Sequence, residues 1–335
     1  MRRRQTAIWE WVLLAALLLA AAWVLWTELR PPRGLGPPVA QHGVAIRAES
    51  LSGSGTAIAG VRLAGALALG SDDPGFGGLS GLAALPDGRL LAISDAGMWL
   101  RLRPVVRPSR DGGMLVGVAN AEMGGQPAPP GGEKYDMDSE SLAVAPDGRL
   151  AVSFEQQHRI LIYDGVPPRR LVAARWRTPA MRWLPNGGGE ALVLLPDGAM
   201  LWLPGVAQAG LHRAVIIAAS GRTRSINVAG LPGFAITDAV TLDATRVLLL
   251  HRRFTGVETA AALSLIDVAS LRNGSATARP LLRWGGDAPW PIDNMEGATI
   301  AREAGRPVLY LVSDNNFSAA QRTLLLRLEL PRNIG

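Results

Sequence analysis

The stretch Gly78–Asp95 (GLSGLAALPDGRLLAISD) places two short apolar runs on either side of a Pro-Asp-Gly sequence. Apolar runs of this length, bounded by turn residues, are typical of buried β-strands. Proline presets the backbone for a tight turn, aspartate bonds to its own backbone, and glycine accepts a positive φ. The stretch therefore predicts a β-hairpin.

This hairpin pattern recurs along the chain. It returns as Asp138–Glu155 (DSESLAVAPDGRLAVSFE) and Gly189–Leu201 (GEALVLLPDGAML), and in weaker form as Thr237–Arg253 and Asn294–Asp314. Aligning the turns gives equivalent places, 48 to 60 residues apart, to Ser80, Glu140, Glu190, Asp238 and Glu296. Repeats of about 40–50 residues with several strands each are the signature of propeller blades. We therefore expect an all-β fold, a β-propeller of five or six blades, over residues 44–335.

One further segment bears on how the ring closes. Val61–Leu69 (VRLAGALAL) precedes the first copy of the repeat, and Thr323–Leu330 follows the last. Pairing of these two segments would close the ring and remove exposed strand edges.

Composition excludes several classes of protein. The 335 residues include 48% hydrophobic residues, which is enough for a core and argues against disorder. The absence of Cys excludes a disulfide framework, a Cys nucleophile and a thiolate metal site. The four His are not clustered, so a His-based zinc site is not expected. Of the net charge of +6, half comes from residues 1–33, so the body shows no nucleic-acid footprint.

The N-terminus has the pattern of a membrane signal. Three arginines, Arg2 to Arg4, precede the apolar stretch Ile8–Trp26, with tryptophans near both of its ends. We expect residues 1–30 to form a single-pass signal anchor in a bacterial inner membrane, with the propeller in the periplasm; the alternative is a cleaved signal peptide. Residues 31–43, rich in Pro and Gly, are expected to be a linker.

The acids at matched repeat positions are the candidate site. The first strand of each propeller blade lines the central channel, so Glu140, Glu190, Asp238 and Glu296 should form a ring. A second ring falls at the end of the next strand, with Asp95, Glu155, Asp314 and the cluster His251-Arg252-Arg253. Oxygen ligands without Cys or clustered His point to Ca²⁺, or Mg²⁺ as the alternative. Such an ion beside Arg252 and Arg253 could hold a phosphate ester and activate water. In the alternative interpretation, each acid caps amides in its own blade.

The chain resembles the phytase-like family of β-propeller proteins, described by esterase-like activity of phytase. The resemblance is carried by Gly78-Leu-Ser-Gly-Leu82, Ser139-Glu-Ser-Leu142, Leu250-His-Arg-Arg-Phe254, Asp293-Asn-Met-Glu-Gly297 and Val312-Ser-Asp-Asn-Asn-Phe-Ser318. It covers about residues 60–330. A departure is His251, which stands where the family more often has an acid before the arginine, and Lys134 is the only lysine.

The resemblance implies an exported bacterial protein that hydrolyses phosphoesters. By motif, the functional positions are Asp95, Glu140, Glu155, Glu190, Asp238, Arg253, Glu296, Asp314 and Asn315. We expect catalysis by Glu140, Glu296, Arg253 and Asp314, substrate binding by Arg252, Arg253 and Asn315, and metal binding by Asp95, Glu140, Glu155, Glu190, Asp238, Glu296 and Asp314.

The expected function is a membrane-anchored periplasmic phosphoester hydrolase, phytase-like or phosphodiesterase-like and divalent-cation dependent. Alternatives are a non-catalytic propeller that binds a ligand or envelope protein, and a sugar-lactone or quinone-linked enzyme. The sequence leaves the substrate and the oligomeric state open.

Overall fold

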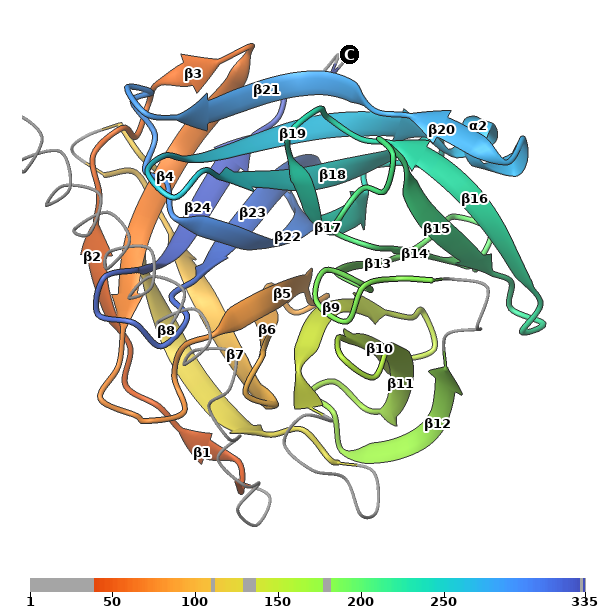
Figure 1. Ribbon diagram of the computed structural model, residues 1–335. Coiled ribbons are helices and arrows are strands. Elements are labelled where there is room, and N and C mark those ends of the chain that lie inside the picture. Colours follow the sequence, from red (N-terminus) through yellow and green to blue (C-terminus); the bar gives the residue numbers. More distant parts are fainter. Residues whose placement is uncertain (1–38, 110–111, 129–136, 177–181, 332–333, 335) are drawn as a thin grey trace, which may run out of the picture. The chain divides into compact units, whose positions relative to one another are not determined.

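Five β-sheets surround a common axis, as Figure 1 shows for the computed structural model. The structure describes residues 39–109, 112–128, 137–176, 182–331 and 334, which belong to one compact unit, Gly36–Gly335. The predicted all-β propeller is confirmed, and the number of blades is five. The expected signal anchor, residues 1–30, lies outside the described residues; within those residues, no helix has the length and apolar character needed to cross a membrane.

The blades follow one another along the chain, each running from the axis outward. The first contains β5 (Leu79–Ala84), β6 (Leu90–Ser94), β7 (Met98–Val106) and β8 (Leu115–Gly125), with β1 (His42–Gly43) at its edge. The second contains β9 (Ser139–Val144), β10 (Arg149–Phe154), β11 (Arg159–Asp164) and β12 (Arg170–Trp176). The third contains β13 (Ala191–Leu194), β14 (Met200–Leu203), β15 (His212–Ile217) and β16 (Thr223–Ala229), with β20 (Ser275–Thr277) parallel to β16.

The last two blades complete the ring. The fourth contains β17 (Ala235–Thr241), β18 (Arg246–Phe254), β19 (Thr259–Asp267) and β21 (Arg279–Gly285), and the short helix α2 (Val268–Arg272) follows β19. The fifth contains β22 (Asn294–Glu303), β23 (Arg306–Asp314), β24 (Thr323–Glu329), β4 (Val61–Gly70), β2 (Arg47–Ser50) and β3 (Ala57–Ile58). The first strand, β1, begins inside the range expected to be linker.

Strand β4, which precedes the first blade in the chain, closes the ring as predicted. It pairs antiparallel with β24, from Thr323 opposite Leu69 to Glu329 opposite Arg62. The fifth blade is therefore built from both ends of the described chain. This pairing satisfies the backbone groups that a free edge of β24 would leave exposed.

The Pro-Asp-Gly turns have the geometry that their residues predict. In the first of them, the N–H of Gly88 donates to the carbonyl of Leu85 at 3.0 Å, and the φ of Gly88 is +79°. The second and third copies repeat this bond: the N–H groups of Gly148 and Gly198 donate to the carbonyls of Ala145 and Leu195, and the φ values of the two glycines are +82° and +80°. A turn followed by a left-handed glycine makes a short hairpin loop that suits the twist of the two strands.

Bulges in the inner strands place side chains near the axis. Pairing of β9 with β10 goes from Ser139–Phe154 to Ser141–Ser153 and skips Glu140. The same shift skips Ser80 in β5, Thr237 in β17 and Glu296 in β22. A bulge leaves one residue out of the ladder and redirects its side chain.

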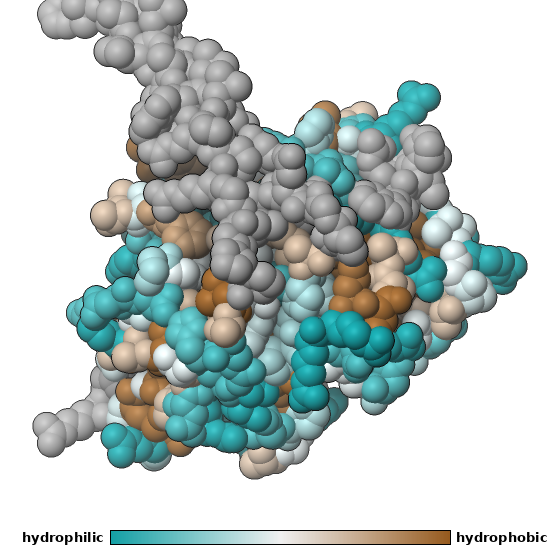
Figure 2. Space-filling model, turned by 90° about the horizontal axis from the view of Figure 1, so that it is seen from below, coloured by the Kyte–Doolittle hydropathy of each residue, from teal (hydrophilic) through white to brown (hydrophobic). Residues whose placement is uncertain are grey.

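The hydrophobic core lies in the seams between blades. Five large clusters of buried apolar residues each join two neighbouring blades, for example Leu91 and Trp99 of the first blade with Val152 and Phe154 of the second. The surface shown in Figure 2 mixes hydrophilic side chains with smaller hydrophobic patches. Burial in the seams holds the inner strands at fixed positions around the axis, and the bulged residues with them.

Candidate functional site: an acid cluster at one end of the propeller

Acids from several blades gather at the end of the axis where the inner strands begin. The bulge positions bring Glu140 from β9 and Glu296 from β22, and Glu190 stands directly before β13. The ends of the second strands bring Glu155, directly after β10, and Asp314, the last residue of β23. The prediction that repeat positions converge is therefore met by these five acids, which come from the second, third and fifth blades.

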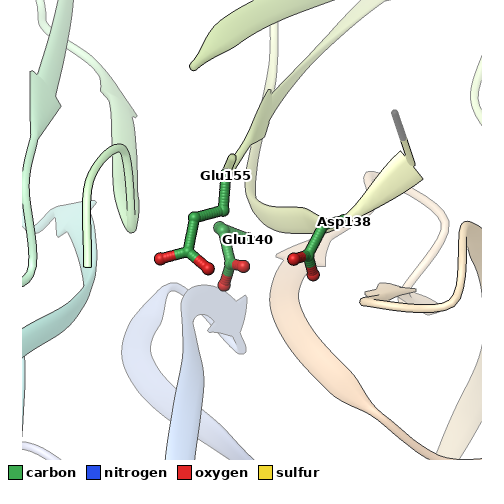
Figure 3. Close-up of side chains that lie close together, drawn as sticks. All are labelled: Asp138, Glu140 and Glu155. Carbon is green, nitrogen blue, oxygen red and sulfur yellow. The ribbon is translucent and has the colours of Figure 1, made fainter. Parts of the chain in front are cut away.

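Three acids of the second blade form the tightest group (Figure 3). Asp138, Glu140 and Glu155 each offer a carboxylate oxygen, and these oxygens all lie within 4.8 Å of one another. The backbone fixes this geometry, because the N–H of Glu155 donates to the carbonyl of Asp138 at 2.9 Å and Glu140 occupies the bulge between them. All three side chains are partly buried.

Glu190 of the third blade extends this group. Its carboxyl group lies near that of Glu155, and each of the two affects the pKa of the other. Glu155 also accepts a hydrogen bond from the N–H of Gly187. A Cβ on Gly205 would stand 2.5 Å from Cγ of Glu190, so only glycine leaves room for the Glu190 side chain here.

The fourth and fifth blades contribute a positive charge and two more acids. The Nε of Arg252 lies 3.1 Å from Oε1 of Glu296. The Nδ2 of Asn294 donates to Oδ2 of Asp314 at 3.3 Å, and the N–H of Asn316 donates to Oδ1 of Asp314 at 2.6 Å. Arg252 is 31% exposed, so its remaining donors can reach a ligand from solvent.

Burial and mutual repulsion raise the pKa values of these acids. Burial raises the pKa of Glu140 well above its usual range, and the charges of Glu190, Asp138 and Glu155 raise it further. The same causes raise the pKa of Glu190. Burial raises the pKa of Glu155 and of Glu296 to about 7, although Gly187 and Arg252 respectively oppose the shift. Burial also raises the pKa of Asp314 to about 6. A site that favours protonated acids near neutral pH also favours a cation that can replace the protons.

Asp238 lies deeper and plays a different part. Its carboxylate accepts hydrogen bonds from Ser141 Oγ at 2.7 Å, from the N–H of Ala298 at 2.7 Å and from the N–H of Ala239 at 2.8 Å. Burial raises its pKa well above the usual range, against the effect of these three donors. Asp238 is 2% exposed, and its hydrogen-bond partners lie on the second, fourth and fifth blades.

The turn alignment is corrected by one residue in the fourth repeat. The bond from Leu242 N–H to the carbonyl of Arg246 matches the bond from Leu85 to Arg89 in the first repeat. Ser80 lies five residues before Leu85, and the residue five places before Leu242 is Thr237. Thr237, and not Asp238, is therefore the equivalent of Ser80. Thr237 and Ser80 make the same contact, each donating from its hydroxyl to a carbonyl at the start of a neighbouring inner strand, Met295 and Ser139 respectively. The irregular turn Asp243-Ala244-Thr245 hid this offset.

Three other predicted site residues have different surroundings. Arg253 reaches Glu258 Oε2 at 3.3 Å and lies over the ring of Phe234 at 5.1 Å, so the register places Arg252 and not Arg253 opposite the acids. Asn315 accepts hydrogen bonds from the N–H groups of Gly78 and Phe317 at 3.0 and 3.2 Å. Asp95 stays in the first blade, where its N–H donates to Gly78 at 2.9 Å.

Sequence reasoning did not select Asp138 for the site. A signal was present, because Asp138 stands two residues before Glu140, and residues two apart on a strand point to the same face. The bulge at Glu140 breaks this alternation, so only the structure shows that the two carboxylates meet.

The geometry of the three-acid group fits a hard cation. Two oxygens on one Ca²⁺ ion stand at most about 5 Å apart, because each lies 2.3–2.6 Å from the ion. The separations among Asp138, Glu140 and Glu155 meet this limit, and all the donors are carboxylates. Glu190 is close enough to join or exchange with them.

A cavity of about 500 Å³ lies at the opposite end of the blades. It is lined by the first Pro-Asp-Gly turn and by the β22–β23 hairpin, including Arg89, Glu303 and Tyr310. Its polar groups bond to one another or to nearby side chains: Tyr310 donates to Glu303 at 2.6 Å, and Glu303 pairs with Arg327 at 2.6 Å. This cavity has no part in the acid cluster.

Comparison with known proteins identifies the family. The model of the phytase-like family, described as esterase-like activity of phytase, matches residues 74–317. No curated protein matches the chain significantly.

Solved structures with a similar fold include a streptogramin B lyase (11% identity, 85% of this chain and 98% of that chain, TM-score 0.41). Others are a gluconolactonase from Xanthomonas campestris (15%, 90% and 99%, TM-score 0.42) and a PQQ-bound aldose sugar dehydrogenase from Streptomyces coelicolor (14%, 88% and 100%, TM-score 0.37). At such low identities and TM-scores these similarities carry no inference about activity.

Proposed function

We propose that this chain, which belongs to the phytase-like family, is a divalent-cation-dependent phosphoester hydrolase with the acid cluster as its active site. Calcium is the cation proposed. We further propose that residues 1–30 anchor the protein in a bacterial inner membrane, with the propeller in the periplasm.

One observation carries the proposal: six acids from three blades converge with one arginine from a fourth. The acids are Asp138, Glu140, Glu155, Glu190, Glu296 and Asp314, and the arginine is Arg252. Burial, together with like charges at this density, destabilises the ionised site and raises the pKa values of Glu140 and Glu190. A cluster of acids that destabilises the folded protein when ionised is expected where the acids bind a ligand.

The residues divide into three roles. Asp138, Glu140 and Glu155 would hold the cation, which when bound would polarise a phosphoryl oxygen and lower the pKa of a nearby water. Arg252, which contacts Glu296, would hold a phosphate oxygen by charge-assisted hydrogen bonds. Glu296, with a pKa raised to about 7, can take or give a proton near neutral pH.

The overall reaction consumes one water. The water oxygen forms a bond to phosphorus while the bond from phosphorus to the leaving oxygen breaks. Glu296 would accept the proton that the water loses, and Glu190, whose pKa is raised by burial, would give its proton to the leaving oxygen. The free alcohol and the phosphate product then leave toward solvent.

The test uses residues 36–335, which form one compact unit. Phosphomonoesters and diesters are assayed after EDTA treatment and after return of Ca²⁺ or Mg²⁺, and bound metal is measured by elemental analysis. We expect turnover that depends on Ca²⁺, and its loss in Glu140→Gln. Calcium binding without turnover on any ester would instead support a non-catalytic ligand-binding propeller.

A further inference from the structure

Exposed apolar side chains gather around the acid cluster. Nine large hydrophobic residues are exposed in the described part of the chain, and six of them lie in or beside the loops at the end where the acids meet. They are Leu184, Val206, Leu211, Phe254, Val257 and Phe317. Isolated exposed apolar residues are ordinary, but a group around a polar site is not.

Val206 lies directly beside the acids of the second and third blades. Its side chain packs over Gly187, whose N–H donates to Glu155. The residue before it, Gly205, packs against Glu190. Val206 is nevertheless 41% exposed, so one face of it remains available next to the cluster.

Phe317 borders the cluster on the side of the fifth and first blades. Its ring lies against Gly77 and Gly78, and a Cβ on Gly77 would stand 3.1 Å from the ring. The backbone at Phe317 is left-handed, with a φ of +49°, which is uncommon for a bulky residue. Asn315 holds this conformation by accepting from the N–H of Phe317, yet the ring is 47% exposed. A strained backbone that presents an aromatic ring to solvent suggests a binding role.

Phe254 borders the cluster on the fourth blade. It stands two residues after Arg252 on β18, and residues two apart on a regular strand share a face. Phe254 is 63% exposed, and Val257 at the tip of the same hairpin is 96% exposed. Strand β18 therefore places the guanidinium of Arg252 next to the acid cluster and the ring of Phe254 farther out along the same face.

The charge balance limits what the polar part can bind. Among the described residues, the cluster holds six carboxyl groups, and Arg252 is the arginine paired with one of them. When ionised, these groups together carry a charge of −5, which two divalent cations would reduce to −1. A ligand with many phosphates would add far more negative charge to this site than a ligand with a single phosphate group.

We propose that the site takes an amphiphilic phosphoester, with one phosphate on the acid cluster and Arg252 and an alkyl or acyl chain across Val206, Phe254 and Phe317. We name these three residues the apolar rim. The inference rests on the proposed function, because it assigns the phosphate to the same cluster. Insertion of the apolar rim into a membrane is the competing use of these side chains.

The experiment compares ligands that differ only in chain length. Binding of ethylphosphonate and octylphosphonate to residues 36–335 is measured by calorimetry in Ca²⁺, and turnover is measured with ethyl phosphate and octyl phosphate. We expect octylphosphonate to bind at least about tenfold more tightly, since burying a few methylenes contributes that much. In the double variant Phe254→Ala with Phe317→Ala the ratio should fall toward one. Val172→Ala is the control, because Val172 is similarly exposed but lies on β12, away from the rim.

The outcomes separate the two proposals. Turnover of both phosphates with equal binding of both phosphonates would overturn the apolar rim and leave the hydrolase standing. Absence of both turnover and phosphonate binding would overturn the hydrolase and the rim with it. Equal phosphonate binding together with sedimentation on phosphatidylcholine vesicles that the double variant loses would assign the rim to a membrane surface instead.

Discussion

Asp238 and Ser141 meet across the propeller axis. Ser141 Oγ in β9 donates to Asp238 Oδ1 in β17 at 2.7 Å, although the second and fourth blades are not neighbours in the ring. The other oxygen of Asp238 accepts from the N–H of Ala298 in the fifth blade, and Ser141 Oγ accepts from the N–H of Leu192 in the third. These two side chains therefore tie four blades together below the acid cluster. Gly81 and Gly297 pack closely at the same level, where a Cβ on Gly297 would stand 3.1 Å from the backbone of Gly81.

Replacing Asp238 by Asn should destabilise the fold. One side of the amide would present an N–H group to the N–H of Ala298 or to the hydroxyl of Ser141, so a buried donor would lose its acceptor. We expect the free energy of unfolding to fall by roughly 1–3 kcal/mol, measured by urea denaturation. Asp287→Asn, at an exposed position, should leave it unchanged. Equal stability of the two variants would contradict the role of Asp238 as a tie between blades.

Replacing Glu140 by Gln should have opposite effects with and without calcium. In EDTA at pH 8 the variant should be more stable, on the order of 1 kcal/mol, because Glu140 no longer repels Glu190, Asp138 and Glu155. Wild-type protein should gain about 2.7 kcal/mol when Ca²⁺ reaches one hundred times its Kd, and the variant should lose most of that gain. Thermal melts with and without Ca²⁺ measure both. Glu258→Gln, at the same end but paired with Arg253, should keep the full calcium response.

Without metal, stability should fall as the pH rises from 6.5 to 8. Glu155 and Glu296 have pKa values raised to about 7, above the ordinary value of 4.5, so the folded protein binds more protons than the unfolded chain between these values. Their stabilising contribution is complete below about pH 4.5 and is lost through pH 7. His251 acts in the opposite sense at lower pH, because burial lowers its pKa to about 3 and its contribution is lost as the pH falls below 6.5.

His251, with an ordinary pKa of 6.5 in the unfolded chain, and His42, whose pKa is raised by hydrogen bonds to Ala40 and Asp73, also titrate near this window, so the comparison with Glu296→Gln is what isolates the acid. Each shift corresponds to roughly 3 kcal/mol over its whole range, but most of this is lost below pH 6.5, so between pH 6.5 and 8 we expect a loss of roughly 1 kcal/mol for each acid in EDTA. Urea denaturation of wild-type protein and Glu296→Gln at pH 6.5 and 8 gives the slopes. A wild-type slope of zero, or one as steep in the variant, would show that Glu296 ionises normally.

Arg252 and Arg253 should differ sharply although they are adjacent. Arg252→Gln removes the positive charge beside Glu296, so the KM for a phosphomonoester should rise at least about tenfold. The pKa of Glu296 should also rise, which moves the acidic limb of the pH–rate profile upward. Arg253→Gln removes a contact with Glu258 and Phe234 and should change KM less than about twofold. Similar KM values for the two variants would contradict the assignment of Arg252 to the substrate.

Much of the architecture could be predicted from local pattern. Short apolar runs around Pro-Asp-Gly predicted the hairpins, and their spacing predicted the propeller, because turn chemistry and strand burial act over a few residues. Closure by β4 against β24 was also predicted, since an unpaired apolar segment at one end required a partner at the other.

The candidate site was less predictable, because its geometry depends on register. The irregular turn Asp243-Ala244-Thr245 hid that Thr237, and not Asp238, occupies the bulge of the fourth blade. The register of β18 likewise turns Arg252 rather than Arg253 toward the acids. Asp138 joins Glu140 only because the bulge at Glu140 redirects the second carboxylate. A shift of one residue along a strand turns a side chain to the opposite face of the sheet. The spacing between repeats does not give strand positions to within a single residue, so it cannot predict which face each side chain occupies.

The amino-acid sequence by itself determined the repeat, the turns, the closing strand and the supply of acids at one end of each hairpin. Only the tertiary structure decided which acids meet, which one is buried as a tie between blades, and which arginine faces them. The physical reason is that strand formation depends on neighbours in the chain, whereas the position of a carboxylate near the axis depends on bulges and on packing between blades that are distant in sequence.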